Sequence, residues 1–339
     1  MSDLQVGGQA VIEGVMMRSP GCFAVALRTP SGRILLRERR WVSLAQRWRF
    51  LRWPFFRGVL VLAESLHNGI SALNFSAAVA DPGNKDAGGA AEKPASLWIT
   101  LAFAILMALA LFAALPHFLT WGLGKAVSSE ELTGGRSVSF HVVDGAIKLA
   151  IFIGYVYLIS LLPDVRRVFQ YHGAEHKAIA AFEHREPLTV ENARKHSTLH
   201  PRCGTSFLLV VLLTAILVFT AVFPMVPAVS DIGVLNQVFF VFVKLLLLFP
   251  IAGFAYEVIR FSARHPGNRL LSAAVWPGLM TQRITTREPD DAQLEVALAS
   301  IRAVLLREES LRLNPGAPAV ESVEEFESFD AYVKHAEAA

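Results

Sequence analysis

Four long apolar runs constrain what this chain of 339 residues can fold into. They span residues 97–121, 142–162, 206–229 and 237–259, and each is almost free of charged residues. A helix of about 20 apolar residues crosses a hydrocarbon core of roughly 30 Å. Only 18% of the chain is charged, whereas soluble domains carry about 25%. We therefore predict an all-α membrane protein, built as a four-span transmembrane helical bundle, and exclude an ordinary soluble enzyme.

The basic residues indicate how these helices are oriented. Lys and Arg number twelve in 1–96 and seven in 163–205, but two in 122–141 and none in 230–236. Basic residues favour the cytoplasmic side of a membrane, and the first residues lack the features of a cleaved secretory signal. We predict a multi-pass protein of the cytoplasmic membrane with both termini in the cytoplasm.

The first 40 residues predict a small cytoplasmic β-hairpin. Two β-leaning runs, 23–27 and 33–36, flank the turn-forming residues 29–32. Before them, the segment 7–18 carries three glycines without the spacing of a phosphate-binding loop, so packing is their expected role. We therefore interpret 1–40 as a glycine-containing segment followed by a hairpin.

Residues 41–80 combine aromatic and basic side chains with a helical pattern. Arg57, Glu64 and His67 interrupt the apolar part of this segment, which disfavours a fifth membrane crossing. We predict a cytoplasmic interfacial or re-entrant helix, with the lipid bilayer and anionic lipid headgroups as its partners. Nucleic acid is not an expected partner. A linker is expected at 81–96.

The region after the last apolar run divides into two parts. In 261–313, the sequence predicts a turn at 276–278 and a cytoplasmic amphipathic helix over 290–309. The final residues, 314–339, hold six acidic residues against one lysine, which predicts a mobile acidic tail.

The expected cytoplasmic loop 163–205 concentrates residues that can carry chemistry. It holds five of the ten histidines and one of the two cysteines. In a helix, His172 and His176 share one face and Glu175 stands beside them. A histidine pair with this spacing can bind zinc, and a neighbouring carboxylate can take a proton from bound water.

The spelling H-x-x-E-H resembles the zinc-binding motif of the inverzincin proteases. The resemblance implies His172 and His176 as metal ligands and Glu175 as the general base. It also implies a distant glutamate as the third ligand, for which Glu257 is the candidate. The likeness covers only these residues, because the inverzincins are large two-lobed soluble proteins.

A second group of residues runs directly into the third apolar run. Pro201 disfavours helix at His200, and Cys203 precedes an expected helix N-terminus, where the dipole and Arg202 favour a thiolate. Cys203 is therefore a candidate nucleophile with His196 or His200 as its base. Alternatively, Cys203 and His200 complete the coordination of the same metal. In a third reading, Cys203 is an inert packed thiol and the histidines bind lipid phosphates or cap helices.

Three charged residues lie inside the apolar runs. Asp144 and Lys148 are one helical turn apart and Lys244 lies in the fourth run, so the three can form one cluster. Such a cluster either neutralises itself or belongs to a transport path. Glu257 and Arg260 can likewise form a simple pair at a helix end.

Four blocks of sequence occur in an order that resembles one family. They are GGQAVIEGVMMR at 7–18, YHGAEHK at 171–177, HPRCGTS at 200–206 and TTREP at 285–289. These blocks resemble the YqhQ-like family of bacterial membrane proteins, a domain of unknown function described as a predicted metal-dependent enzyme. The resemblance implies a protein of the bacterial inner membrane. It also adds Glu13 as a candidate ligand or base, because the first block then belongs to the same module as the histidines.

Together these features predict a metal-dependent membrane hydrolase that acts on a membrane-associated peptide or lipid at the cytoplasmic membrane surface. The cofactor is expected to be a divalent metal, with zinc as the preferred ion. The expected site consists of His172, His176, Glu257 and His200 as ligands and Glu175 and Cys203 as catalytic groups. The alternative is a non-catalytic membrane scaffold or a small-solute or ion transporter. The metal hypothesis requires His172 and His176 to point the same way.

Overall fold

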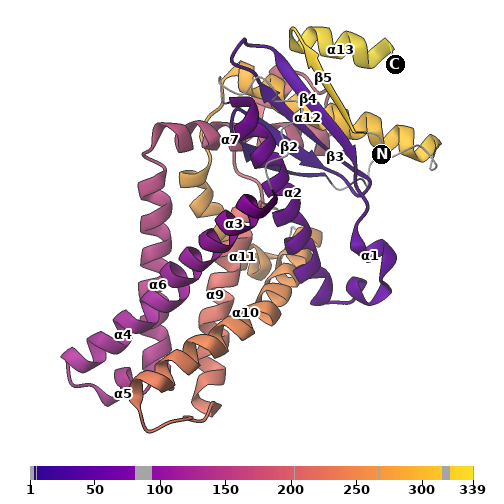
Figure 1. Ribbon diagram of the computed structural model, residues 1–339. Coiled ribbons are helices and arrows are strands. Elements are labelled where there is room, and N and C mark those ends of the chain that lie inside the picture. Colours follow the sequence, from indigo (N-terminus) through magenta and orange to yellow (C-terminus); the bar gives the residue numbers. More distant parts are fainter. Residues whose placement is uncertain are drawn as a thin grey trace.

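The computed structural model describes residues 4, 6–80, 94–201, 203–265, 268–314 and 321–338. An antiparallel sheet lies at one end of the molecule, and long apolar helices extend away from it (Figure 1). The protein is mostly helical, as predicted, but its β-part is larger than the single predicted hairpin.

The sheet has five strands in the order β1-β2-β3-β4-β5. The strands are β1 (Gly7–Val11), β2 (Gly14–Arg18), β3 (Cys22–Arg28), β4 (Ile34–Arg40) and β5 (Ser322–Phe326). The predicted hairpin is confirmed, because Arg28 pairs with Ile34 at the start of the β3 to β4 connection. Gly32 in that connection has a φ of 85°, which glycine adopts without strain.

The glycine-containing segment forms β1 and β2 rather than a loop. A Cβ on Gly14 would lie 2.2 Å from the carbonyl oxygen of Ala26 on β3, so glycine is needed for the two strands to pair. Glu13, in the turn between β1 and β2, has a φ of 54°. The expected packing role of the glycines is therefore confirmed at Gly14.

The prediction of a mobile acidic tail is wrong for the last described residues. They form β5, which pairs with β4, and the helix α13 (Phe329–Ala338). The acidic side chains meet basic partners on β4 or just before it: Glu325 lies 3.1 Å from Arg33, and Glu321 pairs with Arg37. Charge complementarity with a distant strand thus orders a segment that its own composition describes as disordered.

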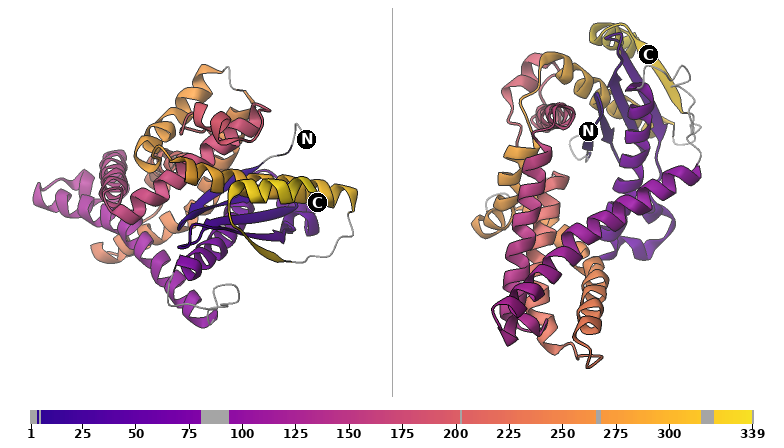
Figure 2. Two further views of the ribbon diagram at one scale, coloured as in Figure 1. Left: turned by 90° about the horizontal axis from the view of Figure 1, so that it is seen from above. Right: turned by 60° about the vertical axis from the view of Figure 1, so that its left-hand side comes forward.

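Helices cover both faces of the sheet (Figure 2). On one face, α2 (Phe56–Ala80) packs Ala72, Phe75 and Val79 against the apolar side chains of β1 to β3. On the other face lie α7 (Pro163–Glu183) and α12 (Asp291–Leu313). The predicted amphipathic helix is α12, and Asp290 and Gln293 form a capping box at its N-terminus.

The segment between β4 and α2 contains two short helices, α1 (Leu44–Arg47) and η1 (Arg49–Arg52). Aromatic side chains of this segment are exposed, including Trp48 at 52% and Trp53 at 63%. The next element, α2, is one continuous helix, and its first part packs on α10. A Cβ on Gly58 of α2 would lie 2.8 Å from the side chain of Tyr256 on α10, so the two helices approach closely there. Helix α2 therefore joins the sheet to the apolar helices.

Among the described residues, four helices are long and apolar enough to cross a membrane, which matches the four predicted runs. These spans are Ala102–Ala126, Val138–Ile159, Gly204–Met225 and Gly233–Ser262. They lie within the elements α3 (Pro94–Leu109), η2 (Ala110–Ala114), α4 (Leu115–Ala126), α6 (Val138–Ile159), α9 (Gly204–Val222), η3 (Phe223–Met225) and α10 (Gly233–Arg264). The short helix α5 (Glu130–Thr133) lies at the end far from the sheet (Figure 1). Of the predicted linker, residues 81–93 lie outside the described part of the chain, and 94–96 already belong to α3.

Two further helices lie near α7 and α9. They are α8 (Val190–Lys195) and α11 (Arg269–Thr285). The predicted turn at 276–278 is wrong, because Pro277 and Gly278 lie inside α11. A Cβ on Gly278 would lie 2.8 Å from the Cα of Ser206, so this glycine allows α11 to pack closely on α9. Helix packing here overrides the local signal for a turn.

Candidate metal centre

The helix α7 presents His172 and His176 on one face, as their spacing predicts. Their ring centroids are 4.4 Å apart. The helix continues through Gly173, where a Cβ would lie 2.0 Å from the carbonyl oxygen of Arg287. This close approach brings the chain after α11 against the histidine pair.

Cys203 completes a compact group with these two histidines. It caps the N-terminus of α9, and its Sγ lies 3.1 Å from Nε2 of His172. The possible ligand atoms of His172, His176 and Cys203 all lie within 4.8 Å of one another. In the part of the chain that the structure describes, no other group of three His, Cys, Asp or Glu residues meets in this way.

Backbone carbonyls fix the orientation of both imidazole rings. Nδ1 of His172 donates to the carbonyl oxygen of Thr285 over 2.8 Å, and Nδ1 of His176 donates to the carbonyl oxygen of Thr198. A carbonyl oxygen only accepts hydrogen bonds, so each Nδ1 carries the proton and each Nε2 keeps a lone pair. Nε2 of His176 is buried without a hydrogen-bond partner among the described residues. Metal-binding histidines are usually oriented by such bonds from their second nitrogen.

This donor set fits zinc. Imidazole nitrogen and thiolate sulfur are preferred zinc ligands, and tetrahedral coordination separates them by about 3.6 Å. The three possible ligand atoms lie within 4.8 Å of one another, and Nε2 of His172 lies 3.1 Å from Sγ of Cys203. Three protein ligands leave the fourth tetrahedral position for water or substrate, which is the arrangement of catalytic zinc sites.

Glu175 is buried beside this group, against β1. A Cβ on Gly8 would lie 2.7 Å from Cγ of Glu175, so glycine lets the strand approach, and the backbone of Gly8 hydrogen-bonds the carboxylate. Burial raises the pKa of Glu175, and the charges of His172 and His200 oppose this rise. The structure therefore brings Glu175 close to the histidine cluster, although no contact with the thiol is present.

His200 lies next to the three-residue group but is not one of its members. Its ring centroid is 5.6 Å from that of His176, and its Nε2 lies 3.4 Å from Glu183. The side chain of Gln282 on α11 binds the backbone of His200 twice. Its oxygen accepts from the N–H of His200 over 2.8 Å, and its nitrogen donates to the carbonyl of His200 over 2.7 Å. Burial lowers the pKa of His200, and the charge of Glu175 opposes this.

The structure does not bring Glu257 to this group. Its carboxylate forms an ion pair with Arg57 of α2, with Nε and Oε1 2.7 Å apart. The partner is therefore Arg57 and not the neighbouring Arg260. Glu257 was a candidate metal ligand only because the motif calls for a glutamate far downstream of the histidines. In the structure, α2 packs on α10, and Glu257 therefore pairs with Arg57.

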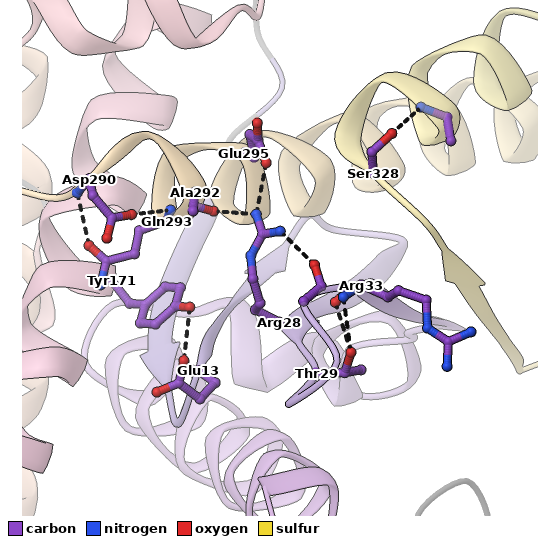
Figure 3. Close-up of polar contacts among 12 residues, drawn as sticks. Glu13, Arg28, Thr29, Arg33, Tyr171, Asp290, Ala292, Gln293, Glu295 and Ser328 are labelled. Atoms are coloured by element: carbon purple, nitrogen blue, oxygen red, sulfur yellow. Dashed lines mark hydrogen bonds and ion pairs between the residues drawn. The ribbon is translucent and has the colours of Figure 1, made fainter.

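Glu13 belongs to the same module as α7 but also lies outside the three-residue group. It pairs with Arg167, and the hydroxyl of Tyr171 donates to it over 3.3 Å (Figure 3). Burial, together with the charge of Glu13, raises the pKa of Tyr171. Glu13 thus connects the turn between β1 and β2 to α7.

The remaining histidines of this region lie together elsewhere. The rings of His184 and His196 are 4.8 Å apart, and His196 lies 3.0 Å from Glu186. The imidazole that contacts Cys203 is therefore His172, rather than His196 or His200 as the thiol hypothesis expected. Arg202 lies outside the described residues. The orienting carbonyls of Thr198 and Thr285 carry no sequence signal of their own, because any residue supplies a carbonyl.

Comparisons with known proteins agree on one family. The family model for "Protein of unknown function (DUF1385)" matches residues 53–307, which include the whole histidine and cysteine group. "Uncharacterized protein YqhQ" of Bacillus subtilis (strain 168) is 33% identical over 317 residues, covering 90% of this chain and 93% of that protein. No solved structure matches the chain.

Proposed function

The chain belongs to the DUF1385 family of proteins of unknown function, and we propose that it is a metal-dependent hydrolase. In this proposal His172, His176 and Cys203 bind a divalent metal, with zinc preferred. The observation that carries it is that both histidines use Nδ1 for backbone carbonyls, which leaves Nε2 of His172 3.1 Å from the thiol of Cys203 and Nε2 of His176 buried without a hydrogen-bond partner among the described residues. Unliganded, this arrangement would leave the buried Nε2 of His176 without a partner.

A bound zinc ion would lower the pKa of coordinated water and polarise a substrate carbonyl. The protein supplies the other parts. Glu175, buried beside His172 with its pKa raised by burial, would accept a proton from the attacking water. The bonds from Thr285 and Thr198 hold both imidazoles still, and the backbone of Gly8 orients the carboxylate of Glu175.

The position of the site supports action at a membrane surface. Cys203 immediately precedes α9, one of the four helices apolar enough to span a membrane. We infer that these helices cross the inner membrane of a bacterium and that the sheet lies on the cytoplasmic side, where basic residues are enriched. The exposed segment from α1 to η1 then meets anionic headgroups with Trp48, Trp53 and the arginines between them.

This location favours a membrane-associated substrate, either a peptide or a lipid. The active protein would be tested in nanodiscs of bacterial lipid, with fluorogenic peptide and lipid ester substrates. We expect hydrolysis that a chelator abolishes and added zinc restores. Glu175→Gln should keep the metal but lose hydrolysis by at least 100-fold, because general-base catalysis contributes about 10² to 10⁴. Loss of hydrolysis together with loss of metal in this variant would contradict the role of Glu175.

A second candidate function is thiol catalysis by Cys203 with His172 as its base. The contact of 3.1 Å between Nε2 and Sγ favours it, since a nucleophile and its base lie within hydrogen-bond reach. The same assay separates the two functions. Hydrolysis that survives the chelator and is abolished by iodoacetamide would support the thiol mechanism and exclude the metal mechanism.

A further inference from the structure

A second group of ionisable side chains is buried inside the apolar helices, far from the histidine and cysteine group. We call it the buried charge cluster, and it consists of Asp144, Lys148, Lys244, His117 and His141. None of these residues is more than 5% exposed. The predicted meeting of the aspartate with the two lysines is confirmed, and the structure adds both histidines.

Lys244 of α10 lies at the centre of the cluster. Its Nζ donates to Oδ2 of Asp144 over 2.7 Å, and Lys148 approaches the same oxygen at 3.3 Å. A third contact joins Nζ of Lys244 to Nδ1 of His117 at 3.0 Å. Aromatic rings of α6, α9 and η3 surround this ammonium group: Phe140, Phe219 and Phe223, whose centroids lie 5.4, 5.5 and 5.9 Å away.

The tautomer of His117 follows from its neighbours. The side-chain nitrogen of Gln237 donates to the carbonyl of Thr133 over 3.1 Å, so its oxygen faces His117. That oxygen lies 2.9 Å from Nε2 of His117, which must therefore carry a proton. Nδ1 is then an acceptor, and it faces the ammonium group of Lys244. A chain of hydrogen bonds thus leads from Asp144 to α5 at the far end of the molecule.

The charges of the cluster do not balance. With Asp144 ionised, both lysines protonated and both histidines neutral, one positive charge is in excess. The helix α9 contributes no charged side chain to offset it. The other charged residues on the elements around the cluster lie toward helix ends and are exposed or half-buried: Lys125, Glu130, Glu131, Glu257, Arg260, Arg264, Arg269 and Arg283. A buried charge without a partner is costly, and loss of one proton removes it.

The cluster also contains unused proton-binding atoms. Oδ1 of Asp144 and both ring nitrogens of His141 are buried without a hydrogen-bonding side chain among the described residues. His141 is 1% exposed, and its ring is tilted against that of Phe223, with centroids 4.6 Å apart. Buried polar atoms normally find partners, so these atoms need an explanation, and Oδ1 of Asp144 can accept a proton without breaking an existing hydrogen bond.

We propose that the buried charge cluster is a proton-exchange site that takes up and releases one proton at the end of the bundle where α5 lies. On release, an N–H bond of the Lys244 ammonium breaks and one forms on Nδ1 of His117. This leaves a neutral amine and an imidazolium, which then loses its Nε2 proton to water entering from the α5 end. Asp144 remains as the counter-ion of the second lysine, so the released state is neutral. The helices then respond to pH or to a proton gradient besides anchoring the chain.

The test is solid-state ¹⁵N NMR of the full chain in liposomes, with lysine and histidine side chains labelled. Signals of the cluster are those missing in Lys244→Met or His117→Gln. We expect at least one of them to change reversibly between its charged and neutral forms between pH 6 and 9. If none of these signals changes in that range in the unsubstituted protein, the proposal is wrong.

Asp144→Asn provides a second readout. Removing the negative charge weakens proton binding, so the midpoint should move to lower pH by at least one unit, a tenfold loss of proton affinity. Asp231→Asn, in the loop before α10, is the matched control and should leave the midpoint unchanged. An equal midpoint in Asp144→Asn and the unsubstituted protein would overturn the role of Asp144. Metal content is measured on the same samples, so a failure here is distinguishable from a failure of the metal proposal.

Discussion

Nε2 of His172 lies 3.1 Å from Sγ of Cys203, although 31 positions separate the two residues along the chain. The contact exists because α7 lies against the N-terminus of α9, with the carbonyl of Thr285 fixing the imidazole from behind. A metal shared by the two groups accounts for this contact and also for the free Nε2 of His176. A thiol and base pair accounts for the contact alone.

Cys203 should supply a thiolate ligand. In the cobalt-substituted protein we expect a thiolate-to-cobalt charge-transfer band in the near-ultraviolet spectrum, which Cys203→Ser abolishes. The matched control is Cys22→Ser, because Cys22 is buried in the sheet and burial raises its pKa to about 12. A band that persists in Cys203→Ser and disappears in Cys22→Ser would contradict the assignment.

Gly173→Ala should destabilise the protein and weaken metal binding. The new Cβ would meet the carbonyl oxygen of Arg287 at 2.0 Å and push the chain after α11 away from α7. Overpacking of this kind costs about 1 to 3 kcal/mol. Gly154→Ala on α6 is the control, because nothing lies within 4 Å of its added Cβ. Thermal unfolding in detergent should separate the two variants, and equal unfolding midpoints would argue against the close packing.

Glu38→Gln on β4 should stabilise the protein at pH 8 but not at pH 4. Burial raises the pKa of Glu38 to about 7 from an ordinary value of 4.5, with Arg307 opposing and Glu324 adding to the rise. The folded state therefore binds this proton more tightly, and its contribution to stability is lost as the pH rises from about 4.5 to about 7. This pKa shift corresponds to a loss of at most about 3 kcal/mol in the free energy of unfolding, and to less for a partly exposed group. A pH-independent effect of the substitution on the unfolding midpoint would contradict this.

Removal of the residues after 314 should expose one edge of the sheet. In the register of the sheet, Leu36 pairs with Glu324 and Glu38 with Ser322, so β4 becomes an edge strand when β5 is absent. We expect faster hydrogen–deuterium exchange of the β4 amides and little change in β2, which lies between β1 and β3. Unchanged exchange in β4 would show that β5 does not pair there in solution.

Features encoded by neighbouring residues were predictable from the sequence. The apolar runs gave the four long helices, and the turn residues at 29–32 gave the hairpin of β3 and β4. The helical spacing of His172 and His176 gave their shared face. Each of these depends on a periodicity or a turn within a single segment, so no knowledge of distant contacts is needed.

Features that depend on distant partners were not predictable. β5 is ordered by a strand almost 290 positions earlier, and Glu257 is held by Arg57, 200 positions away. Pro277 remains in a helix because α11 packs along α9. The role of Cys203 was left open for the same reason: its neighbourhood depends on how α7 meets α9, and its sequence context left three alternatives.

The most direct test of the central claim is elemental analysis of the full chain, purified in mild detergent without a chelator or a histidine tag. We expect close to one zinc or other divalent metal per chain, and its loss from the double variant His172→Ala, His176→Ala. The matched control is His184→Ala, His196→Ala, which removes two histidines of the same region whose rings are 4.8 Å apart and which should keep the metal. Folded, monodisperse protein that contains no metal and binds none on titration with zinc would contradict the account.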